Sequence, residues 1–367
     1  MTCKYALIGT GWRANFFADL ARRMPERFEM TGVLCHSAAG RERALSQWKV
    51  RIYESPEQIV ADKPDFVIAS VPGDAVLELA PFFAERDLPI LFETYCSKSV
   101  EEMENLYRRV GGARIQLAEQ YPFQPMHAAR ISIAASGELG RVYQARASFI
   151  QNYHTLAVLR RLLGIGMELP LVMAWQGENR RAAPSTRAGD PVRDVLETAK
   201  QETFLLDYGE KTAFGDYESM QQRSWIRHPM IQVRGERGEI LNDQVTFLKD
   251  YLTPMTYRLI RSQTGVEGNL EGFDLKGIQG NGEWVYRNPY RHVRMMDDEI
   301  AVATCVDRMR EYALGGRSFY SLEEAFQDHY ICLLIQEAAK TRRPVQAKQE
   351  IWQRSCAAPL GLEQIGR

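Results

Sequence analysis

The stretch Ala6-Leu7-Ile8-Gly9-Thr10-Gly11-Trp12-Arg13-Ala14 places a G-x-G-x-x-A pattern between a strand-like run and the start of a helix. In such a turn Gly9 permits a tight bend, Gly11 lets the backbone approach a pyrophosphate, and Ala14 allows close helix packing. Unpaired N–H groups at the helix start also attract phosphate. A glycine-rich turn can be purely structural, but its position at the first strand–helix junction favours nucleotide binding. We therefore predict a dinucleotide-binding loop with these contact residues: Gly9, Thr10, Gly11, Trp12, Arg13 and Ala14.

Strand-like and helix-like segments alternate through the first third of the chain. Apolar runs suited to strands occur at 4–8, 28–34, 66–70, 89–93 and 114–119. Helix starts of the capping-box type lie between them, at Ser55-Pro56-Glu57-Gln58 and Ser99-Val100-Glu101-Glu102. This alternation is typical of a parallel sheet with helices on its faces. Residues 1–122 are therefore predicted to form a Rossmann domain, which is a doubly wound parallel sheet.

The pattern changes after Pro122 and Pro125. A predicted helix at 126–135 precedes strand-like runs that Gly, Asn and Asp turns separate: 142–151, 171–176, 202–208, 211–217, 230–234 and 284–287. Helices are expected again at 297–313 and 322–339. Residues 123–367 are thus predicted as an α+β domain for substrate binding and oligomerisation, with a large, open, mainly antiparallel sheet. The fold class of the whole chain is α/β, and the stretch 178–194 is the best candidate for a mobile loop.

Composition excludes several classes of protein. The 46 Lys and Arg residues nearly cancel the 47 Asp and Glu residues, so no diffuse positive field favours nucleic acid or an anionic membrane. No apolar run is long enough to cross a bilayer, and Met1-Thr2-Cys3-Lys4 has no signal-peptide pattern, so a cytoplasmic protein is expected. Cysteines and histidines are scattered without metal-ligand spacing, so reduced thiols and no metal are expected.

The ends of later strands supply further cofactor contacts. Leu34-Cys35-His36-Ser37 lacks the acidic residue that binds a ribose hydroxyl, and His36, Ser37 and Arg41 could accommodate a 2′-phosphate instead. Arg41 as a solvated helix residue is an equal alternative, so the cofactor is NAD or NADP, with a slight preference for NADP. Ser70, Val71 and Pro72 follow the fourth strand and Glu93 ends the fifth, where ligands bind in open α/β sheets. Glu93 could equally cap the following turn.

Further motifs follow the glycine-rich turn along nearly the whole chain: Pro64-Asp65-Phe66-Val67-Ile68-Ala69-Ser70-Val71-Pro72, the strand end at Glu93, Gly137-Glu138-Leu139-Gly140-Arg141-Val142 and Tyr320-Ser321-Leu322-Glu323-Glu324-Ala325. Together they resemble the glucose-fructose oxidoreductase/inositol dehydrogenase family, usually called Gfo/Idh/MocA. The resemblance implies a Rossmann domain followed by a domain whose open sheet often forms an oligomer interface. It also implies NAD- or NADP-dependent oxidation or reduction of sugars, cyclitols and related compounds.

The chain departs from this family at two places. Glu93-Thr94-Tyr95 stands where the family commonly has Glu-Lys-Pro, and Ile150-Gln151-Asn152-Tyr153-His154 stands where it has Asp-x-x-x-His. The resemblance therefore implies that His154 is the retained catalytic residue. A histidine at a helix start tends to be neutral and able to accept a proton, although a packed structural histidine is the alternative. Further catalytic candidates are Tyr153, Tyr95, Tyr121 and Thr94.

Trp225, Arg227 and His228 carry side chains that suit sugars or anions, although a solvated loop or a dimer contact is the better interpretation. The leading function is hydride transfer between a nicotinamide and a sugar, cyclitol or related polyol. The alternatives are a sugar-processing lyase or glycosidase that uses bound NAD transiently, and a non-catalytic nucleotide-binding sensor. The expected partners are a small sugar-like substrate and further copies of the chain, in a homodimer or homotetramer.

Overall fold

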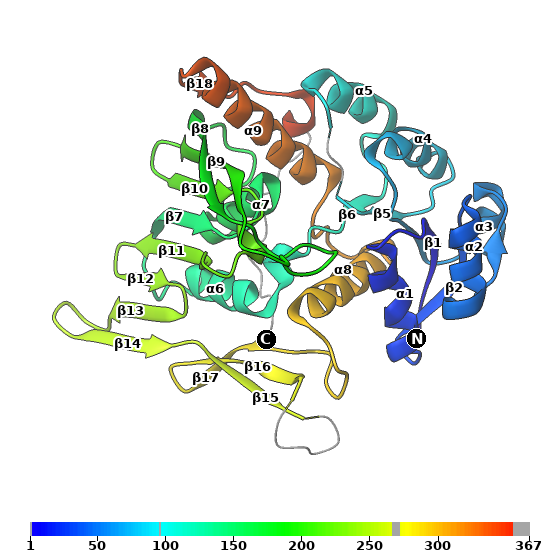
Figure 1. Ribbon diagram of the computed structural model, residues 1–367, viewed down its shortest axis with the longest axis horizontal. Coiled ribbons are helices and arrows are strands. Elements are labelled where there is room, and N and C mark those ends of the chain that lie inside the picture. Colours follow the sequence, from blue (N-terminus) through cyan, green and yellow to red (C-terminus); the bar gives the residue numbers. More distant parts are fainter. Residues whose placement is uncertain (1, 95–96, 266–271, 355–367) are drawn as a thin grey trace. The chain divides into compact units, whose positions relative to one another are not determined.

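The computed structural model describes residues 2–94, 97–265 and 272–354 (Figure 1). The chain divides into two compact units. Unit 1 comprises Met1–Gln124, Gln263–Leu275 and Pro289–Phe326, and unit 2 comprises Pro125–Ser262, Lys276–Asn288 and Gln327–Arg367. The sequence predicts one boundary, between residues 122 and 123. In the structure, unit 1 also includes two later segments, Gln263–Leu275 and Pro289–Phe326.

Unit 1 contains a six-stranded sheet in the order β3-β2-β1-β4-β5-β6. Its strands are β1 (Cys3–Ile8), β2 (Phe28–Leu34), β3 (Ile52–Tyr53), β4 (Phe66–Ala69), β5 (Ile90–Phe92) and β6 (Ile115–Leu117). All neighbouring strands are parallel. The strand order reverses between β1 and β4, which is the point where open α/β sheets bind ligands. The predicted doubly wound Rossmann sheet is confirmed.

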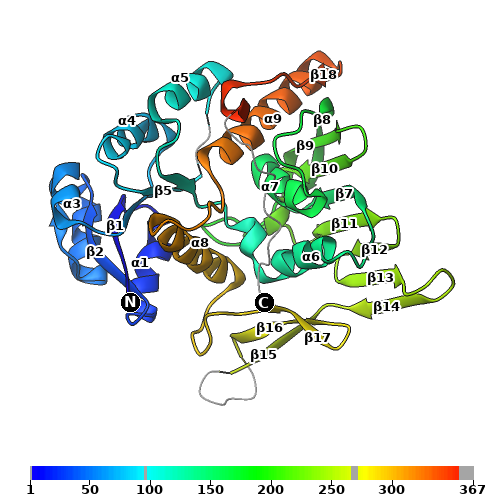
Figure 2. The ribbon, with the colours of Figure 1, turned by 180° about the vertical axis from the view of Figure 1, so that it is seen from behind.

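Helices cover both faces of this sheet. They are α1 (Ala14–Arg23), α2 (Ala38–Arg43), α3 (Pro56–Asp62), α4 (Gly73–Ala84), α5 (Val100–Val110) and α8 (Asp297–Ala313). Figures 1 and 2 show α8 beside α1, with α4 and α5 on the other side of β5. The buried face of α8 includes the small residues Ala301, Ala303 and Cys305, which allow close packing. This packing explains why unit 1 includes a segment from late in the chain.

Unit 2 is built on a nine-stranded sheet in the order β14-β13-β12-β11-β7-β10-β9-β8-β18. Its strands are β7 (Val142–Ser148), β8 (Leu171–Ala182), β9 (Leu196–Asp207), β10 (Thr212–Glu218), β11 (Met230–Gly235), β12 (Gly238–Leu241), β13 (Gln244–Leu248), β14 (Pro254–Arg258) and β18 (Val345–Gln346). Only the β7–β10 pair among the described strands of this sheet is parallel. The predicted large, mainly antiparallel sheet is confirmed. A separate three-stranded sheet contains β15 (Ile260–Thr264), β16 (Asp274–Gly280) and β17 (Glu283–Arg287).

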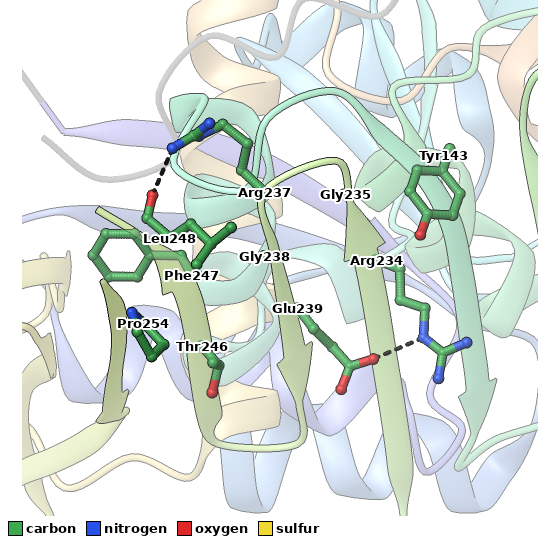
Figure 3. Close-up of a pocket in the computed structure, with 10 residues that line it drawn as sticks. All are labelled: Tyr143, Arg234, Gly235, Arg237, Gly238, Glu239, Thr246, Phe247, Leu248 and Pro254. Carbon is green, nitrogen blue, oxygen red and sulfur yellow. Dashed lines mark hydrogen bonds and ion pairs between the residues drawn. The ribbon is translucent and has the colours of Figure 1, made fainter. Parts of the chain in front are cut away.

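The helices α6 (Pro125–Ser136) and α7 (Asn152–Leu163) lie on one face of the nine-stranded sheet (Figure 1). The helix α9 (Leu322–Thr341) belongs to unit 2 from Gln327 onward. A recess of about 460 Å³ lies on strands β7 and β11 to β14. Figure 3 draws its lining residues, which include Tyr143, Arg234 and Glu239. Arg234 and Glu239 form an ion pair of 2.7 Å there. No helix in the described part of the chain has the length and apolar character needed to cross a membrane.

The prediction of a loop at 178–194 is wrong for its first residues. Strand β8 continues to Ala182, and Arg181 pairs in register with Glu197 of β9. Arg181 is buried, so its strand position is stabilised by tertiary contacts that local composition does not reveal. The predicted strand 142–151 also ends earlier, at Ser148, and helix α7 begins at Asn152.

Candidate functional site

The glycine-rich turn lies at the carboxyl ends of β1, β2 and β4. The Gly9 N–H donates to the Leu34 carbonyl at 3.0 Å, and the Ser70 N–H donates to the Ile8 carbonyl at 2.8 Å. Gly9 has a φ of 101°, and a Cβ there would lie 2.2 Å from the Ser70 carbonyl oxygen. Position 9 therefore requires glycine for two reasons, backbone conformation and close packing.

Gly11 differs from Gly9, because a Cβ at position 11 would meet no atom within 4 Å. The protein itself thus gives no packing reason for glycine, and the open space is compatible with the predicted approach of a pyrophosphate. Ala14 is completely buried at the start of α1, as its predicted packing role requires. Trp12 is half exposed beside the turn. Thr10 packs against Gly40 of α2, and its carbonyl accepts a hydrogen bond from Arg43.

The residues after β2 have structural roles of their own. Ser37 caps α2, since its Oγ accepts a hydrogen bond from the Gly40 N–H at 3.1 Å. Arg41 forms a two-pronged ion pair with Glu54, at distances of 3.0 and 2.5 Å. His36 is exposed. A 2′-phosphate would therefore have to compete with the Glu54 carboxylate for the Arg41 guanidinium.

Glu93 at the end of β5 belongs to a charged cluster that also includes Arg13 and Asp298. The Arg13 Nε lies 2.5 Å from Glu93 Oε1, and its Nη1 lies 2.9 Å from Asp298 Oδ2. Gln120 and Gln124 donate from their amides to Asp298 Oδ1 at 3.3 and 3.4 Å. Burial would lower the pKa of Arg13, but the Glu93 and Asp298 carboxylates outweigh it and raise that pKa above the usual value. This cluster ties the glycine-rich turn to β5 and α8.

Glu93 also acts within its own turn, because its Oε2 accepts hydrogen bonds from the Thr94 N–H and hydroxyl at 3.3 and 3.4 Å. Both roles that the sequence left open for Glu93, facing the nucleotide turn and capping, are thus compatible with its position. Tyr95 lies outside the described residues. The sequence prediction missed Asp298, because its acidic neighbours make it indistinguishable from an ordinary helix start.

Cys305 lies in the core near the charged cluster. Burial, followed by the nearby Glu119 carboxylate, raises the pKa of its thiol well above the usual value. Burial likewise raises the pKa of Cys35 and of Cys3. A raised thiol pKa disfavours the thiolate form that a nucleophilic cysteine needs. Within the described ranges, no group of three or more His, Cys, Asp or Glu side chains is arranged to hold a metal.

Unit 2 places His154 in the first turn of α7, as predicted. The His154 ring is buried, and its centroid lies 4.0 Å from that of Tyr153. His329 of α9 lies on Tyr153 as well, with a centroid distance of 5.0 Å. The Tyr153 ring thus contacts two imidazoles, one from each of the two helices.

His329 is a site residue that the sequence prediction missed. Its separation from Tyr153 along the chain hides the contact, and no local motif marks it. A buried ion pair brings the two helices together: Arg160 Nη1 of α7 lies 2.7 Å from Asp328 Oδ1 of α9. Ile150 stands at the position that corresponds to the family's Asp, so this position has no carboxylate. The Ile150 side chain is buried.

The strand order and the glycine turn at its switch point define unit 1 as a nucleotide-binding Rossmann domain. Residues 3–120 match the family model of Gfo/Idh/MocA, described as an oxidoreductase family with an NAD-binding Rossmann fold. This part of the chain belongs to that family. The predicted family and its nicotinamide cofactor are confirmed there. No curated protein sequence matches the chain.

Solved structures share the fold over nearly the whole chain. Levoglucosan dehydrogenase in complex with NADH and levoglucosan has 17% identity and a TM-score of 0.68, covering 95% of this chain and 100% of its own. An oxidoreductase from Agrobacterium radiobacter, in complex with NAD+, L-tartaric acid and magnesium, has 16% identity and a TM-score of 0.64, covering 94% and 98%. GenD2 from gentamicin A biosynthesis, in complex with NAD, has 15% identity and a TM-score of 0.62, covering 95% and 97%. At these identities the similarity establishes the fold.

Proposed function

We propose that this protein transfers a hydride between a nicotinamide cofactor and a secondary alcohol or ketone of a sugar, cyclitol or related polyol. The observation that carries the proposal is the G-x-G-x-x-A turn at the switch point of a parallel sheet that belongs to an NAD-binding oxidoreductase family. The fold shared with levoglucosan dehydrogenase, which was solved with levoglucosan and with L-sorbose, supports a sugar-like substrate. The retained His154 supports catalysis.

NAD is the nucleotide that we propose, with NADP as the alternative. The preference for NADP rested partly on Arg41, and that guanidinium is already paired with Glu54. The strand end at Cys35-His36-Ser37 has no carboxylate for a ribose hydroxyl, so the expected preference for NAD is modest. Parallel calorimetric titrations with NADH and NADPH measure it directly, and tighter binding of NADPH would reverse this choice.

The chain's own residues have distinct roles in the proposed reaction. Backbone N–H groups from Gly9 to Ala14 hold the pyrophosphate. Bound nicotinamide supplies the hydride acceptor. His154 would accept the proton of the substrate hydroxyl at an imidazole nitrogen. Tyr153 orients the reacting oxygen, and Thr94 donates a hydrogen bond in place of the family's lysine.

The decisive experiment follows the formation of NADH from NAD+ and of NADPH from NADP+ with a panel of substrates. The panel contains levoglucosan, sorbose, inositols and simple glycosides. The proposal expects turnover with at least one member, and loss of that turnover in a Gly11→Val variant that still folds. No turnover with any member, despite nucleotide binding, would contradict the dehydrogenase function.

Because two residues that the family commonly has are absent, the experiment must also distinguish two alternative functions. Thr94 replaces the lysine and the buried Ile150 replaces the aspartate, so the usual proton-transfer set is incomplete. An enzyme that oxidises a sugar carbon transiently, allows elimination and then returns the hydride would consume substrate without net NADH, which mass spectrometry of the products detects. A non-catalytic sensor would bind nucleotide and leave every sugar unchanged.

A further inference from the structure

Trp225 is an exposed tryptophan that is nevertheless held in place. Its side chain belongs to the loop between β10 and β11 and is 77% exposed. The indole Nε1 donates to Ser185 Oγ at 2.8 Å, and the Ser185 hydroxyl donates to Asp190 Oδ1 at 2.6 Å. Because its N–H is satisfied within the protein, the apolar faces of the ring are left for an outside molecule.

A buried ion network anchors the loop that carries Trp225. Arg181 of β8 is buried, and its Nε lies 3.0 Å from Glu218 Oε2 at the end of β10. The Arg227 Nε and Nη2 donate to the two oxygens of the same carboxylate, at 3.0 and 3.3 Å. Residues on both sides of Trp225 are therefore fixed. Such anchoring reduces the entropy that a ligand must overcome when it binds to the ring.

A recess of about 290 Å³ lies beside the indole. Its lining includes Asp190, Arg193, Asp194 and Val195 from the β8–β9 loop, together with Trp225. The recess belongs to the same end of the nine-stranded sheet as the start of α7. The loop that carries Trp225 is connected to the end of β7 by a hydrogen bond of 3.1 Å from the Gln221 amide to the Oγ of Ser148, the last residue of β7. Helix α7, with His154, begins four residues later.

We propose that this recess binds a carbohydrate ring, with its C–H face on Trp225 and its hydroxyls on Asp190 and Asp194. It would be a subsite for a sugar unit adjoining the one that reacts, and in this respect it rests on the proposed function. The volume is close to the lower end of ligand pockets, which suits a single ring. Charged side chains beside the indole favour a hydroxylated ligand over a second copy of the chain, because interface cores are depleted of charge.

Saturation-transfer NMR on the full-length protein, with no nucleotide added, tests the subsite independently of turnover. The probes are methyl β-glucoside, maltose and cellobiose. We expect transfer to at least one probe, and a dissociation constant at least tenfold weaker in Trp225→Ala. Asp190→Asn should weaken binding less. Trp175→Ala is the matched control, since Trp175 is also exposed (47%) but lies on β8 away from the recess lining, and it should retain binding.

Absence of transfer to every probe in the parent protein, or equal affinity of parent and Trp225→Ala, would overturn the subsite. A smaller oligomer in Trp225→Ala together with unchanged sugar binding would also overturn it and identify the loop as a contact between copies. Because these readouts need neither cofactor nor turnover, an inactive protein that binds sugar at Trp225 would contradict the oxidoreductase function and leave the subsite standing.

Discussion

A Cβ at position 11 would contact no other atom of the protein, so a substitution of Gly11 can affect nucleotide binding without affecting folding. Gly11→Val should abolish measurable nucleotide binding with little change in thermal stability, because the added side chain meets only the open space expected for the pyrophosphate. Titration calorimetry with NADH and a thermal melt measure the two effects. Gly9→Ala is the contrasting variant: its Cβ would meet the Ser70 carbonyl, so it should lower stability by at least about 1 kcal/mol. Unchanged NADH affinity in Gly11→Val would refute the site.

We propose His154 as the proton acceptor, because the family resemblance implies that it is the retained catalytic residue. His154→Asn keeps some hydrogen bonding but removes the base, so turnover should fall by roughly 10²- to 10⁴-fold with nucleotide affinity nearly unchanged. Steady-state kinetics on an active substrate from the panel measure the change. Comparable turnover of variant and parent would move the proton-transfer role to Tyr153, Tyr95 or Tyr121. Loss of folding would favour a structural histidine.

A different histidine, His127, should make stability depend on pH. Burial, followed by the nearby Arg130 charge, lowers the pKa of His127 from the usual 6.5 to about 3. Below pH 6.5 the unfolded chain binds a proton at this residue that the folded chain excludes, so stability falls progressively until about pH 3. Between pH 7.5 and 5 this residue should account for roughly 2 kcal/mol of lost stability.

Urea unfolding of the parent and of His127→Leu at these two pH values tests this. The substitution changes the absolute free energy of unfolding, so the informative quantity is the difference between the two pH values within each protein. That difference should be smaller in His127→Leu. Equal differences in both proteins would show that His127 is not the group responsible.

At the scale of single elements, helix starts show how a local motif can succeed or fail. Ser99 caps α5 as predicted, since its Oγ accepts from the Glu102 N–H at 3.2 Å. At the start of α3 the predicted box is wrong: Gln58 Oε1 accepts from the Glu54 N–H, and Ser55 makes no capping hydrogen bond. The side chain of Gln58 can reach either of two neighbouring N–H groups, and the spacing of residues does not distinguish them.

A reciprocal box occurs at the start of α9. The Ser321 N–H donates to Glu324 Oε2 at 2.9 Å, and the Glu324 N–H donates to Ser321 Oγ at 3.3 Å. Ser321→Ala should therefore lower the free energy of unfolding by about 1 kcal/mol. Ser55→Ala is the matched control and should cost less than about 0.5 kcal/mol, because no cap is lost. Equal costs in urea unfolding would contradict the assignment of the box.

At the scale of the whole molecule, the nine-stranded sheet carries several exposed large apolar side chains, and apolar surface of this kind can mark a protein–protein contact. They include Tyr143, Met173, Trp175, Leu241, Leu248 and Met255. We expect the protein to associate with copies of itself through this sheet, as a homodimer or homotetramer. Light scattering at micromolar concentration should give a multiple of 42.0 kDa, and a mass equal to one chain would count against association.

Local pattern was sufficient for the Rossmann domain and for several features of its candidate nucleotide site. The turn from Gly9 to Ala14, the strand ends near Ser70 and Glu93, and the helix start before His154 are all encoded within a few consecutive residues. Glycine, capping residues and apolar periodicity act over such short distances, so they can be read without knowing the fold.

Contacts between distant segments depended on tertiary structure. The ion pair of Arg13 with Asp298 joins residues 285 positions apart, and no local pattern announces it. The same holds for His329, which reaches Tyr153 because the buried Arg160–Asp328 pair links α7 with α9. The packing of whole helices and strands decides which side chains form such contacts. Sequence periodicity indicates only which face of a helix or strand is buried. For that reason the sequence specified the nucleotide turn and the start of α7, and the folded chain specified which charges and rings surround them.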